Sequence, residues 1–372
     1  MLRDLSTLSS DTLAGLGIRS ALFFAPVAVL LALAVGSLYF AGELTDPVKV
    51  VQNQETTPAL YYPIAHPRSV LPKYKLAGAT IRQPDTLVLG SSRANSVRSE
   101  FVRDRFYNAA VWSAVTVGFV RPFLMRLPQS HLPRHLLLTI DPWWFYRAVP
   151  VQPESDFFRA STPFEIVDFS WRTGLSWLIR RQAYNSPNRI GIAAKELDGG
   201  IRPDGSFVPG SNFIATRPNI EKGQFEEFVE GTDPWFHTGS AAISGAAIDE
   251  MKRLLEYCSR FHISVIGYIS PLHPALYQAV RKDQRLNINF QVAPILAQVF
   301  QQYKFPFIDL QNPAKSGCQT DEFVDLVHES EVCTVRNFLA MAQQDLRVTA
   351  VVDPDKLRMY LVNRRSEWQL GF

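Results

Sequence analysis

Thr86-Leu-Val-Leu-Gly-Ser-Ser-Arg-Ala-Asn95 joins a short apolar run to a glycine, two serines and a polar turn. A short apolar run that ends in turn residues is typical of a strand buried on both faces of a parallel sheet. A helix is expected after the turn, from Val97 to Arg105. The stretch therefore predicts the strand–turn–helix unit from which α/β sheets are built.

The same alternation continues along the chain and predicts four more strands, at residues 106–108, 135–141, 262–269 and 305–310. Further helices are expected at residues 111–127, 238–261, 274–303 and 330–344. Thr238 or Ser240 is the expected N-cap of the helix over 238–261. Five short strands that alternate with helices predict an α/β fold with a doubly wound, parallel, five-stranded sheet. In such sheets, ligands bind beyond the carboxyl ends of the strands.

Residues 20–42, SALFFAPVAVLLALAVGSLYFAG, contain no charged side chain. A helix of this length spans roughly 30 Å of hydrocarbon, at about 1.5 Å per residue. We expect an uncleaved transmembrane helix; a cleaved signal peptide and a buried core helix are the alternatives. Arg3 and Arg19 precede the run, and the first basic residue after it is Lys49. The positive-inside rule then places residues 1–19 in the cytoplasm and the rest of this single-pass chain outside.

The rest of the sequence divides by composition. Residues 43–84 are punctuated by prolines and are expected to form a linker. Residues 85–346 are expected to form the α/β domain, with a long insertion over 142–237 after the third strand. No element is assigned to the C-terminal extension, 347–372. The 372 residues carry 38 basic and 35 acidic side chains, a net charge of +3, so nucleic acid is not an expected partner.

The chain has three cysteines, and none of them forms a CxxC pair. A zinc ribbon or a thioredoxin-like centre is therefore not expected, and no metal or cofactor is predicted. In an oxidising compartment Cys318 and Cys333 can close a loop of about 15 residues, which stabilises a protein by roughly 3 kcal/mol in the chain-entropy model. Free thiols at both positions are the alternative. Cys258 falls on the apolar face of a predicted helix and is expected to be a buried thiol.

Two groups of reactive side chains follow the first and the last predicted strands. Ser92 lies in the turn after the first strand, and Asp325 and His328 come after the fifth. Parallel strands end at the same edge of their sheet, so these residues are predicted to meet there. A serine nucleophile, a histidine base and an aspartate that orients the histidine form a catalytic triad. The sequence shows no P-loop, GxGxxG, HExxH or GxSxG motif.

Each of these residues also has a structural interpretation. Ser92 is a good N-cap for the helix expected after it. Asp325 and His328 are spaced to form a hydrogen-bonded pair on a loop. His273, which follows the fourth strand, is a second candidate for the base.

The order strand, Gly90-Ser91-Ser92, helix and finally Asp325-Leu-Val-His328 resembles the SGNH (GDSL-type) hydrolase superfamily. The resemblance is closest to the membrane-anchored GSS-type members associated with modification of bacterial cell-wall and exopolysaccharide glycans. It covers roughly residues 85–345, with the insertion unmatched. It implies a flavodoxin-like SGNH fold, Ser92 as nucleophile, His328 as base and Asp325 as its orienting carboxylate.

The family needs hydrogen-bond donors for an oxyanion, and here the chain departs from the pattern. After the second strand, Ala110, Ser113 or Ala114 is expected to supply a backbone N–H. The asparagine of the family's G-x-N-D block is missing, and Asp141 stands in that region. An ionised Asp141 would repel an oxyanion, and a lost donor costs about 10²–10³ in rate.

Five further residues are candidate substrate contacts. Arg93 is a candidate for binding an anionic group, with a surface salt bridge as the alternative. Trp143 and Trp144 are candidate stacking platforms for a sugar ring, together with Trp235 and Phe236. The alternative is that these aromatic rings fill space beneath the insertion.

From these features we expect an exported, membrane-anchored serine esterase or O-acyltransferase of the bacterial inner membrane, with its C-terminal domain in the periplasm or outside. Its expected ligands are an acylated glycan or an acyl donor, and the bilayer contacts residues 20–42. The resemblance also implies a multi-spanning membrane protein as the source of acyl groups. The alternative function is a non-catalytic SGNH-like module that binds glycan or scaffolds a biosynthetic complex.

Overall fold

The computed structural model describes residues 10–64, 67–112, 116–146, 188–233, 236, 242–366 and 368–370. Its centre is a parallel sheet with the spatial order β3-β2-β4-β8-β9. The five strands are β2 (Thr86–Leu89), β3 (Phe106–Asn108), β4 (His135–Thr139), β8 (Ser264–Ile269) and β9 (Phe307–Asp309). In chain order this is 2-1-3-4-5, one of the two common orders of doubly wound sheets. The prediction of an α/β fold with a parallel, five-stranded sheet is confirmed.

Both faces of this sheet are buried, which explains the unbroken apolar runs in the sequence. Leu87 and Leu136 point into one core, and Val88 and Leu137 point into the other. The first core also contains side chains of α4 (Val120–Arg126), α10 (Gly245–Arg260), α11 (Pro274–Lys282) and α12 (Ile288–Gln302). The second contains side chains of α13 (Glu331–Gln344) and α14 (Pro354–Val362). Helices therefore cover both faces of the sheet. This covering is expected because successive side chains of a strand point to opposite faces and both faces of a parallel sheet are buried.

Several predicted helices differ from the observed ones. The helix expected from Val97 to Arg105 is wrong, because the chain forms two 3-10 turns instead, η2 (Ser92–Ala94) and η3 (Ser99–Phe101). The side-chain amide of Asn108 donates to the carbonyls of Ala94 and Val97, and the Val97 carbonyl is one that an α-helix over 97–105 would need for its own ladder.

The other helix predictions need smaller corrections. The helix expected over 111–127 is limited to a 3-10 turn at 117–119 and to α4. Helix α10 begins at Gly245, and its N-cap is Ser244, not Thr238 or Ser240. The stretch 274–303 is divided between α11 and α12 at Asp283, whose carboxylate accepts the N–H of Arg285.

Residues 43–84 are folded onto the domain rather than extended as a linker. They form α2 (Pro47–Thr56), β1 (Leu60–Tyr61) and α3 (Pro67–Arg82). Val50, Val51 and Tyr74 are fully buried in the first core. Two prolines stand in the first turn of a helix, where the missing N–H is harmless, so proline content alone did not distinguish these helices from a loop.

The described part of the insertion, residues 142–146, 188–233 and 236, packs with this folded segment. A second sheet has the order β5-β1-β6-β7, in which β1 pairs with strands of the insertion. The elements of the described insertion are β5 (Arg189–Ile190), α8 (Ile192–Leu197), β6 (Gly200–Ile201), β7 (Phe207–Val208) and α9 (Ser211–Glu230). We call β5-β1-β6-β7 the small sheet.

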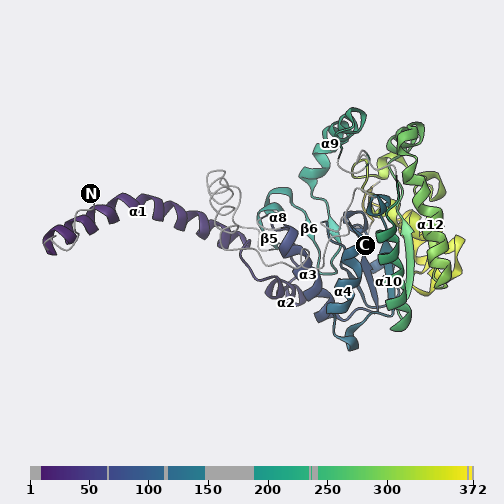
Figure 1. Ribbon diagram of the computed structural model, residues 1–372, viewed down its shortest axis with the longest axis horizontal. Helices are drawn as coiled ribbons and strands as arrows, with labels where there is room; N and C mark the ends of the chain where they lie inside the picture. The colour runs from purple at the N-terminus through teal and green to yellow at the C-terminus, as the bar shows by residue number, and fades with distance from the viewer. Residues whose placement is uncertain are drawn as a thin grey trace.

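Helix α1 (Ser10–Ala41) projects away from the folded part, and the small sheet lies between α1 and the large sheet (Figure 1). Within it, Arg19–Ala41 is long and apolar enough to cross a membrane, with a mean hydropathy of 2.4. The end of α1 is joined to the domain by Glu43, which is buried and accepts the backbone N–H groups of Ile64 and Ile192. The C-terminal extension, for which no element was predicted, includes α14 and packs on α13.

Candidate active site

The turn after β2 holds Ser92 at the carboxyl edge of the large sheet. Gly90 has φ 154°, and a Cβ at this position would lie only 2.8 Å from the carbonyl oxygen of Thr139 on β4. A side chain is therefore excluded there. The hydroxyl of Ser91 caps the following turn by accepting the N–H of Arg93. The interpretation of Ser92 as the N-cap is wrong, because Ser91 has that role and the Ser92 hydroxyl is left for another partner.

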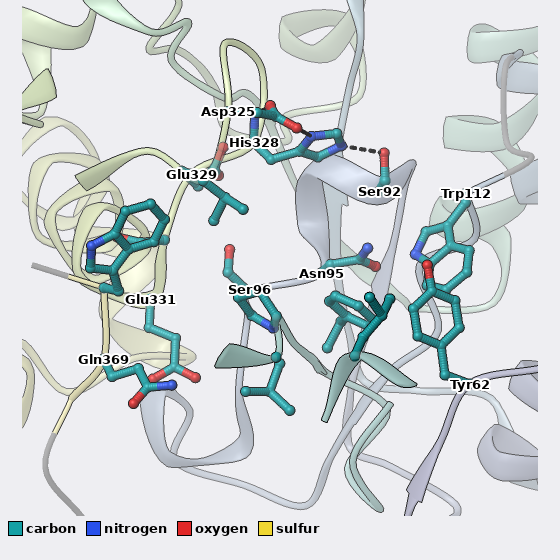
Figure 2. A pocket seen from close by; sticks show the side chains of 18 residues that line it. Tyr62, Ser92, Asn95, Ser96, Trp112, Asp325, His328, Glu329, Glu331 and Gln369 are labelled. Atoms are coloured by element: carbon teal, nitrogen blue, oxygen red, sulfur yellow. Dashed lines mark hydrogen bonds and ion pairs between the residues drawn. The ribbon is translucent and has the colours of Figure 1, made fainter. Parts of the chain in front are cut away.

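That partner is His328. The Ser92 Oγ and the His328 Nε2 are 2.7 Å apart, and the His328 Nδ1 lies 2.7 Å from the Asp325 Oδ2 (Figure 2). The other oxygen of Asp325 accepts the backbone N–H groups of Val327 and His328, at 2.8 and 2.9 Å. The structure thus brings together three residues that lie as far as 236 positions apart in the chain. A hydroxyl, an imidazole and a carboxylate in this order can move a proton away from the serine oxygen.

The electrostatics of the histidine and the aspartate are coupled. Burial acts to raise the pKa of the Asp325 carboxyl, but the His328 ring and the two backbone donors outweigh it and hold this pKa at about 2. Burial acts to lower the pKa of His328, but the Asp325 carboxylate outweighs it and raises the pKa above its usual value. Asp325 is therefore charged at neutral pH and stabilises a proton on His328.

Arg93 is a buried structural residue: it does not line the cavity, and the ion pair that was the alternative does form, with Asp141, but it is buried rather than at the surface. Its Nη2 donates to the carbonyls of Ser270 and Pro271 at 2.7 and 2.8 Å, and its Nε donates to Val327 at 3.0 Å. Its Nη1 lies 3.3 Å from the Asp141 carboxylate. The guanidinium joins the ends of β2, β4 and β8 to the loop that carries His328. It is neither on the surface nor open to a substrate anion.

Asp141 is consequently removed from the position in which it would repel an oxyanion. Its side chain is fully buried, and it is not among the residues that line the cavity next to Ser92. Burial raises the pKa of this carboxyl, while the Arg93 guanidinium acts to lower it. The Asp141 carboxylate is paired with the Arg93 guanidinium.

The backbone donors expected for an oxyanion are not all available. The N–H of Ala110 donates to the side-chain oxygen of Asn108 at 3.0 Å, so Ala110 is not a free donor. Ser113 and Ala114, the other two candidates, lie outside the described residues.

A cavity of about 330 Å³ opens beside the triad. Ser92, Asp325 and His328 form one end of it (Figure 2), and 31% of the His328 side chain is accessible. The small sheet contributes Phe207 and Val208 to the lining of the cavity. The site therefore lies between the carboxyl edge of the large sheet and the small sheet, as expected for a parallel sheet.

Three aromatic rings form one wall of this cavity. Tyr62, Trp112 and Phe207 contact one another edge to face, with ring centroids 4.8, 5.2 and 5.5 Å apart. They come from the segments after β1, after β3 and from β7. We call these three residues the aromatic wall. Sequence reasoning missed it, although the position of Trp112 just beyond a strand end was a usable signal.

The aromatic residues that were proposed as sugar platforms are elsewhere. Trp143 and Trp144 are buried in the first core at 6% and 0% exposure, and Phe236 is buried beside Trp143. The stacking prediction is wrong for these three, and space filling, the alternative, describes them. Trp235 lies outside the described residues.

Charged groups around the cavity are paired or buried. No lysine or arginine is among the described residues that line it. The carboxylate of Glu331 is held by Arg98 and Arg202 at 3.1 and 2.7 Å. Burial raises the pKa of Glu329, next to His328, to about 7, and the hydroxyl of Ser270 donates to it. The cavity is thus suited to a neutral ligand rather than to an anion.

His273 is not a second base. Its Nδ1 accepts the N–H of Ala275 and caps α11, and burial lowers its pKa to about 4. The described residues contain no group of three or more histidine, cysteine, aspartate or glutamate side chains arranged to hold a metal ion.

Cys318 and Cys333 are joined in a disulfide, with their Cα atoms 5.1 Å apart. Asp325 and His328 lie within the loop that it closes. Cys258 is a free, fully buried thiol in the first core, and burial raises its pKa to about 12.

Compared with protein-family models, with curated proteins and with solved structures, the chain matches none. Its function is therefore argued from the chemistry of the site.

Proposed function

We propose that the chain is a serine esterase or O-acyltransferase that works through an acyl-enzyme. The observation that carries the proposal is the continuous relay from Ser92 through His328 to Asp325, with 2.7 Å at each step, at the end of a cavity. A serine placed only for structure would not need an accessible imidazole at this distance. The geometry meets the requirement of a nucleophile, a base and a group that orients the base.

In this mechanism the Ser92 oxygen attacks the carbonyl carbon of an acyl ester while His328 accepts the hydroxyl proton at Nε2. The tetrahedral intermediate collapses, the ester C–O bond breaks, and the alcohol leaves with the proton from His328. The acyl group remains on Ser92. Water then attacks the acyl-enzyme in an esterase, or a second alcohol attacks it in a transferase, with His328 again taking the proton.

The proposed substrate is an acylated cell-surface glycan. Two features of the cavity support it: the aromatic wall presents flat apolar rings, and no lysine or arginine among the described residues lines the cavity. A neutral pyranose has apolar C–H faces and hydroxyl edges that suit such a surface. The resemblance to SGNH hydrolases supports the same substrate class and an SGNH-type fold.

We further propose that the domain is exported and tethered to the bacterial inner membrane by α1. The apolar span Arg19–Ala41 supports this location, and the distribution of basic residues supports a cytoplasmic N-terminus. A multi-spanning membrane protein that delivers acyl groups would then be a suitable partner for the transferase reaction.

The test compares the full-length protein with its Ser92→Ala variant, using an aryl acetate as substrate. We expect Ser92→Ala to lower the rate by about 10³–10⁴-fold or more, because the nucleophile is lost. The matched control is Ser91→Ala, which removes a neighbouring hydroxyl that contacts the turn and leaves the relay intact. Equal turnover in the parent protein and in Ser92→Ala would overturn the proposal.

The alternative function is a non-catalytic glycan-binding module, favoured by the aspartate in place of the family's asparagine. A fluorophosphonate probe separates the two functions, because it reacts with an activated serine. Labelling of the peptide that contains Ser92, absent from Ser92→Ala, supports the enzyme. No labelling, together with measurable binding of polysaccharide, supports the module.

A further inference from the structure

A tetrahedral intermediate on Ser92 needs a hydrogen-bond donor for its oxyanion, and the expected side-chain donor is missing. The G-x-N-D asparagine is absent, Asp141 is paired with Arg93, and the Ala110 N–H is bound to Asn108. Preorganised donors of this kind supply one of the largest parts of the rate enhancement in acyl transfer. This inference rests on the proposed function and concerns which side chain donates a hydrogen bond to the oxyanion.

Asn95 lies three residues after the nucleophile, directly after the 3-10 turn η2. Side chains at positions i and i+3 lie one above the other in 3-10 geometry, so Asn95 and Ser92 face the same side. Figure 2 shows Asn95 beneath Ser92, beside Trp112, and both Asn95 and Ser92 line the cavity. The placement of Asn95 below the nucleophile is therefore a consequence of the short 3-10 turn.

The backbone of Asn95 is held from both sides. Its N–H donates to the carbonyl of Ser92 at 3.0 Å, and its carbonyl accepts the N–H of Phe207 at 2.8 Å. The second bond joins the nucleophile turn of the large sheet to the small sheet. These two bonds fix the backbone position from which the Asn95 side chain extends at the border of the cavity.

The side-chain amide of Asn95 has no hydrogen-bond partner within the described part of the chain. Asn108 is a useful contrast, because both ends of its amide are engaged by Ala94, Val97 and Ala110. Asn95 is only half buried and borders the cavity. Its amide is thus available to a ligand in the cavity.

We propose that the side-chain N–H of Asn95 donates to the oxyanion formed when Ser92 attacks an acyl ester. As the Ser92 Oγ–carbon bond forms, the π electrons of the carbonyl move to its oxygen, and the serine proton goes to His328. The oxygen then carries a full negative charge, which the Asn95 N–H stabilises. When the intermediate collapses, the charge leaves this oxygen and the alcohol takes the proton from His328. Asn95 is in this proposal a catalytic residue.

The test uses Asn95→Ala and Asn95→Asp in the full-length protein, with an aryl acetate as substrate. We expect kcat to fall about 10²–10³-fold in Asn95→Ala with little change in KM, because the contact is made only in the transition state. Asn95→Asp keeps the shape of the side chain and should be at least as damaging, because a carboxylate repels the oxyanion. If Asn95→Ala does not fold, the isosteric Asn95→Asp carries the test.

A second readout separates this role from a structural one. An alkyl boronic acid forms a tetrahedral anion on a reactive serine and mimics the intermediate. Its affinity should fall with kcat in both variants, whereas the thermal midpoint should stay near that of the parent. The matched control is Asn363→Ala, an exposed asparagine at the end of α14, which should leave kcat unchanged.

The outcomes distinguish the two proposals. If Ser92→Ala abolishes turnover but both Asn95 variants keep kcat within about threefold of the parent, Asn95 is not the donor and acyl transfer stands. If Ser92→Ala turns over substrate as fast as the parent, the proposed function itself is wrong.

Discussion

The imidazole of His328 lies between two groups that favour opposite protonation states of the ring. The Ser92 hydroxyl needs an unprotonated Nε2, whereas the Asp325 carboxylate stabilises the protonated ring. Asp325 is itself held as an anion by two backbone N–H groups, and its pKa stays at about 2. At the scale of single residues, the site is a base whose pKa is set by one carboxylate, and this makes its pH dependence predictable.

We predict that kcat/KM falls on the acid side with an apparent pKa above the ordinary histidine value of about 6.5. Below that pH His328 is protonated and cannot accept the Ser92 proton; above it the base is free, so activity rises with pH through the raised pKa of His328. Asp325→Asn removes the carboxylate and should move the acid limb to lower pH while reducing kcat by up to about 10⁴-fold. A pH–rate profile of both proteins measures this.

Asp283→Asn, at the break between α11 and α12, is a suitable control that should leave the profile in place. An acid limb that does not move in Asp325→Asn would show that a group other than His328 controls the rate.

The loop between β9 and α13 is the element that carries the histidine, and it is restrained at several points. The disulfide joins Cys318 near its start to Cys333 in the first turn of α13. From α9, the side-chain oxygen of Gln224 accepts the N–H of Leu326 at 3.0 Å. Arg93, in the turn after β2, donates to the carbonyl of Val327. The position of His328 therefore does not depend on the covalent contact alone, because non-covalent contacts from α9 and from Arg93 also hold the loop.

We predict that replacing the disulfide by Cys318→Ser with Cys333→Ser lowers the free energy of unfolding by about 3 kcal/mol, the loop-closure entropy of a 15-residue loop. Activity at 25 °C should change less than threefold, because Gln224 and Arg93 still hold the loop. Denaturant unfolding followed by fluorescence, together with an ester assay, measures both quantities.

Reduction provides the control for this prediction. A thiol reductant should destabilise the parent protein by a similar amount and leave the double variant unchanged. Equal stability of the parent and the double variant would contradict the assigned role of the disulfide.

On the scale of the whole molecule, the small sheet connects α1 to the site. The end of α1 is tied to the segments that flank this sheet: Glu43 accepts the N–H groups of Ile64, after β1, and of Ile192, at the start of α8, and Leu38 and Ala41 pack on Ile192. The same sheet supplies Phe207 to the aromatic wall. Among the described residues, the end of α1 is thus connected by packed and hydrogen-bonded segments to the part of the molecule that forms the cavity.

We predict that Glu43→Ala weakens the contact between the end of α1 and the folded domain. The backbone N–H groups of Ile64 and Ile192 lose their buried acceptor, at a cost of about 1–3 kcal/mol. Hydrogen–deuterium exchange of the full chain in detergent should show faster exchange at both amides and unchanged exchange in β4 and β8. The matched control is Glu55→Ala. Glu55 lies on the neighbouring α2, and the substitution removes its half-exposed ion pair with Arg82 of α3. Unchanged protection at Ile64 and Ile192 in Glu43→Ala would show that this contact does not depend on Glu43.

The strands of the large sheet were predictable because their signal is local. Each is an apolar run bounded by turn residues, and a strand buried on both faces needs nothing more. The helix expected over 97–105 failed because Asn108, on the neighbouring strand, takes the Val97 carbonyl that the helix would use and also holds the preceding turn at Ala94. The linker expected over 43–84 failed because the burial of Val50 and Tyr74 depends on contacts with distant segments.

For the site, the sequence by itself determined the reactive side chains: a serine after the first strand, and an aspartate and a histidine after the last. Parallel strands end at one edge, which places Ser92 and His328 at the same edge of the sheet. Because β4 and β8 lie between β2 and β9, the contact itself is made by the long loop after β9. Only the tertiary structure decided that Arg93 is buried against Asp141, that the aromatic wall is Tyr62, Trp112 and Phe207, and that Asn95 faces the cavity with a free amide. The physical reason is that burial and hydrogen-bond partners arise between segments far apart in the chain, whereas apolar periodicity is a property of each segment alone.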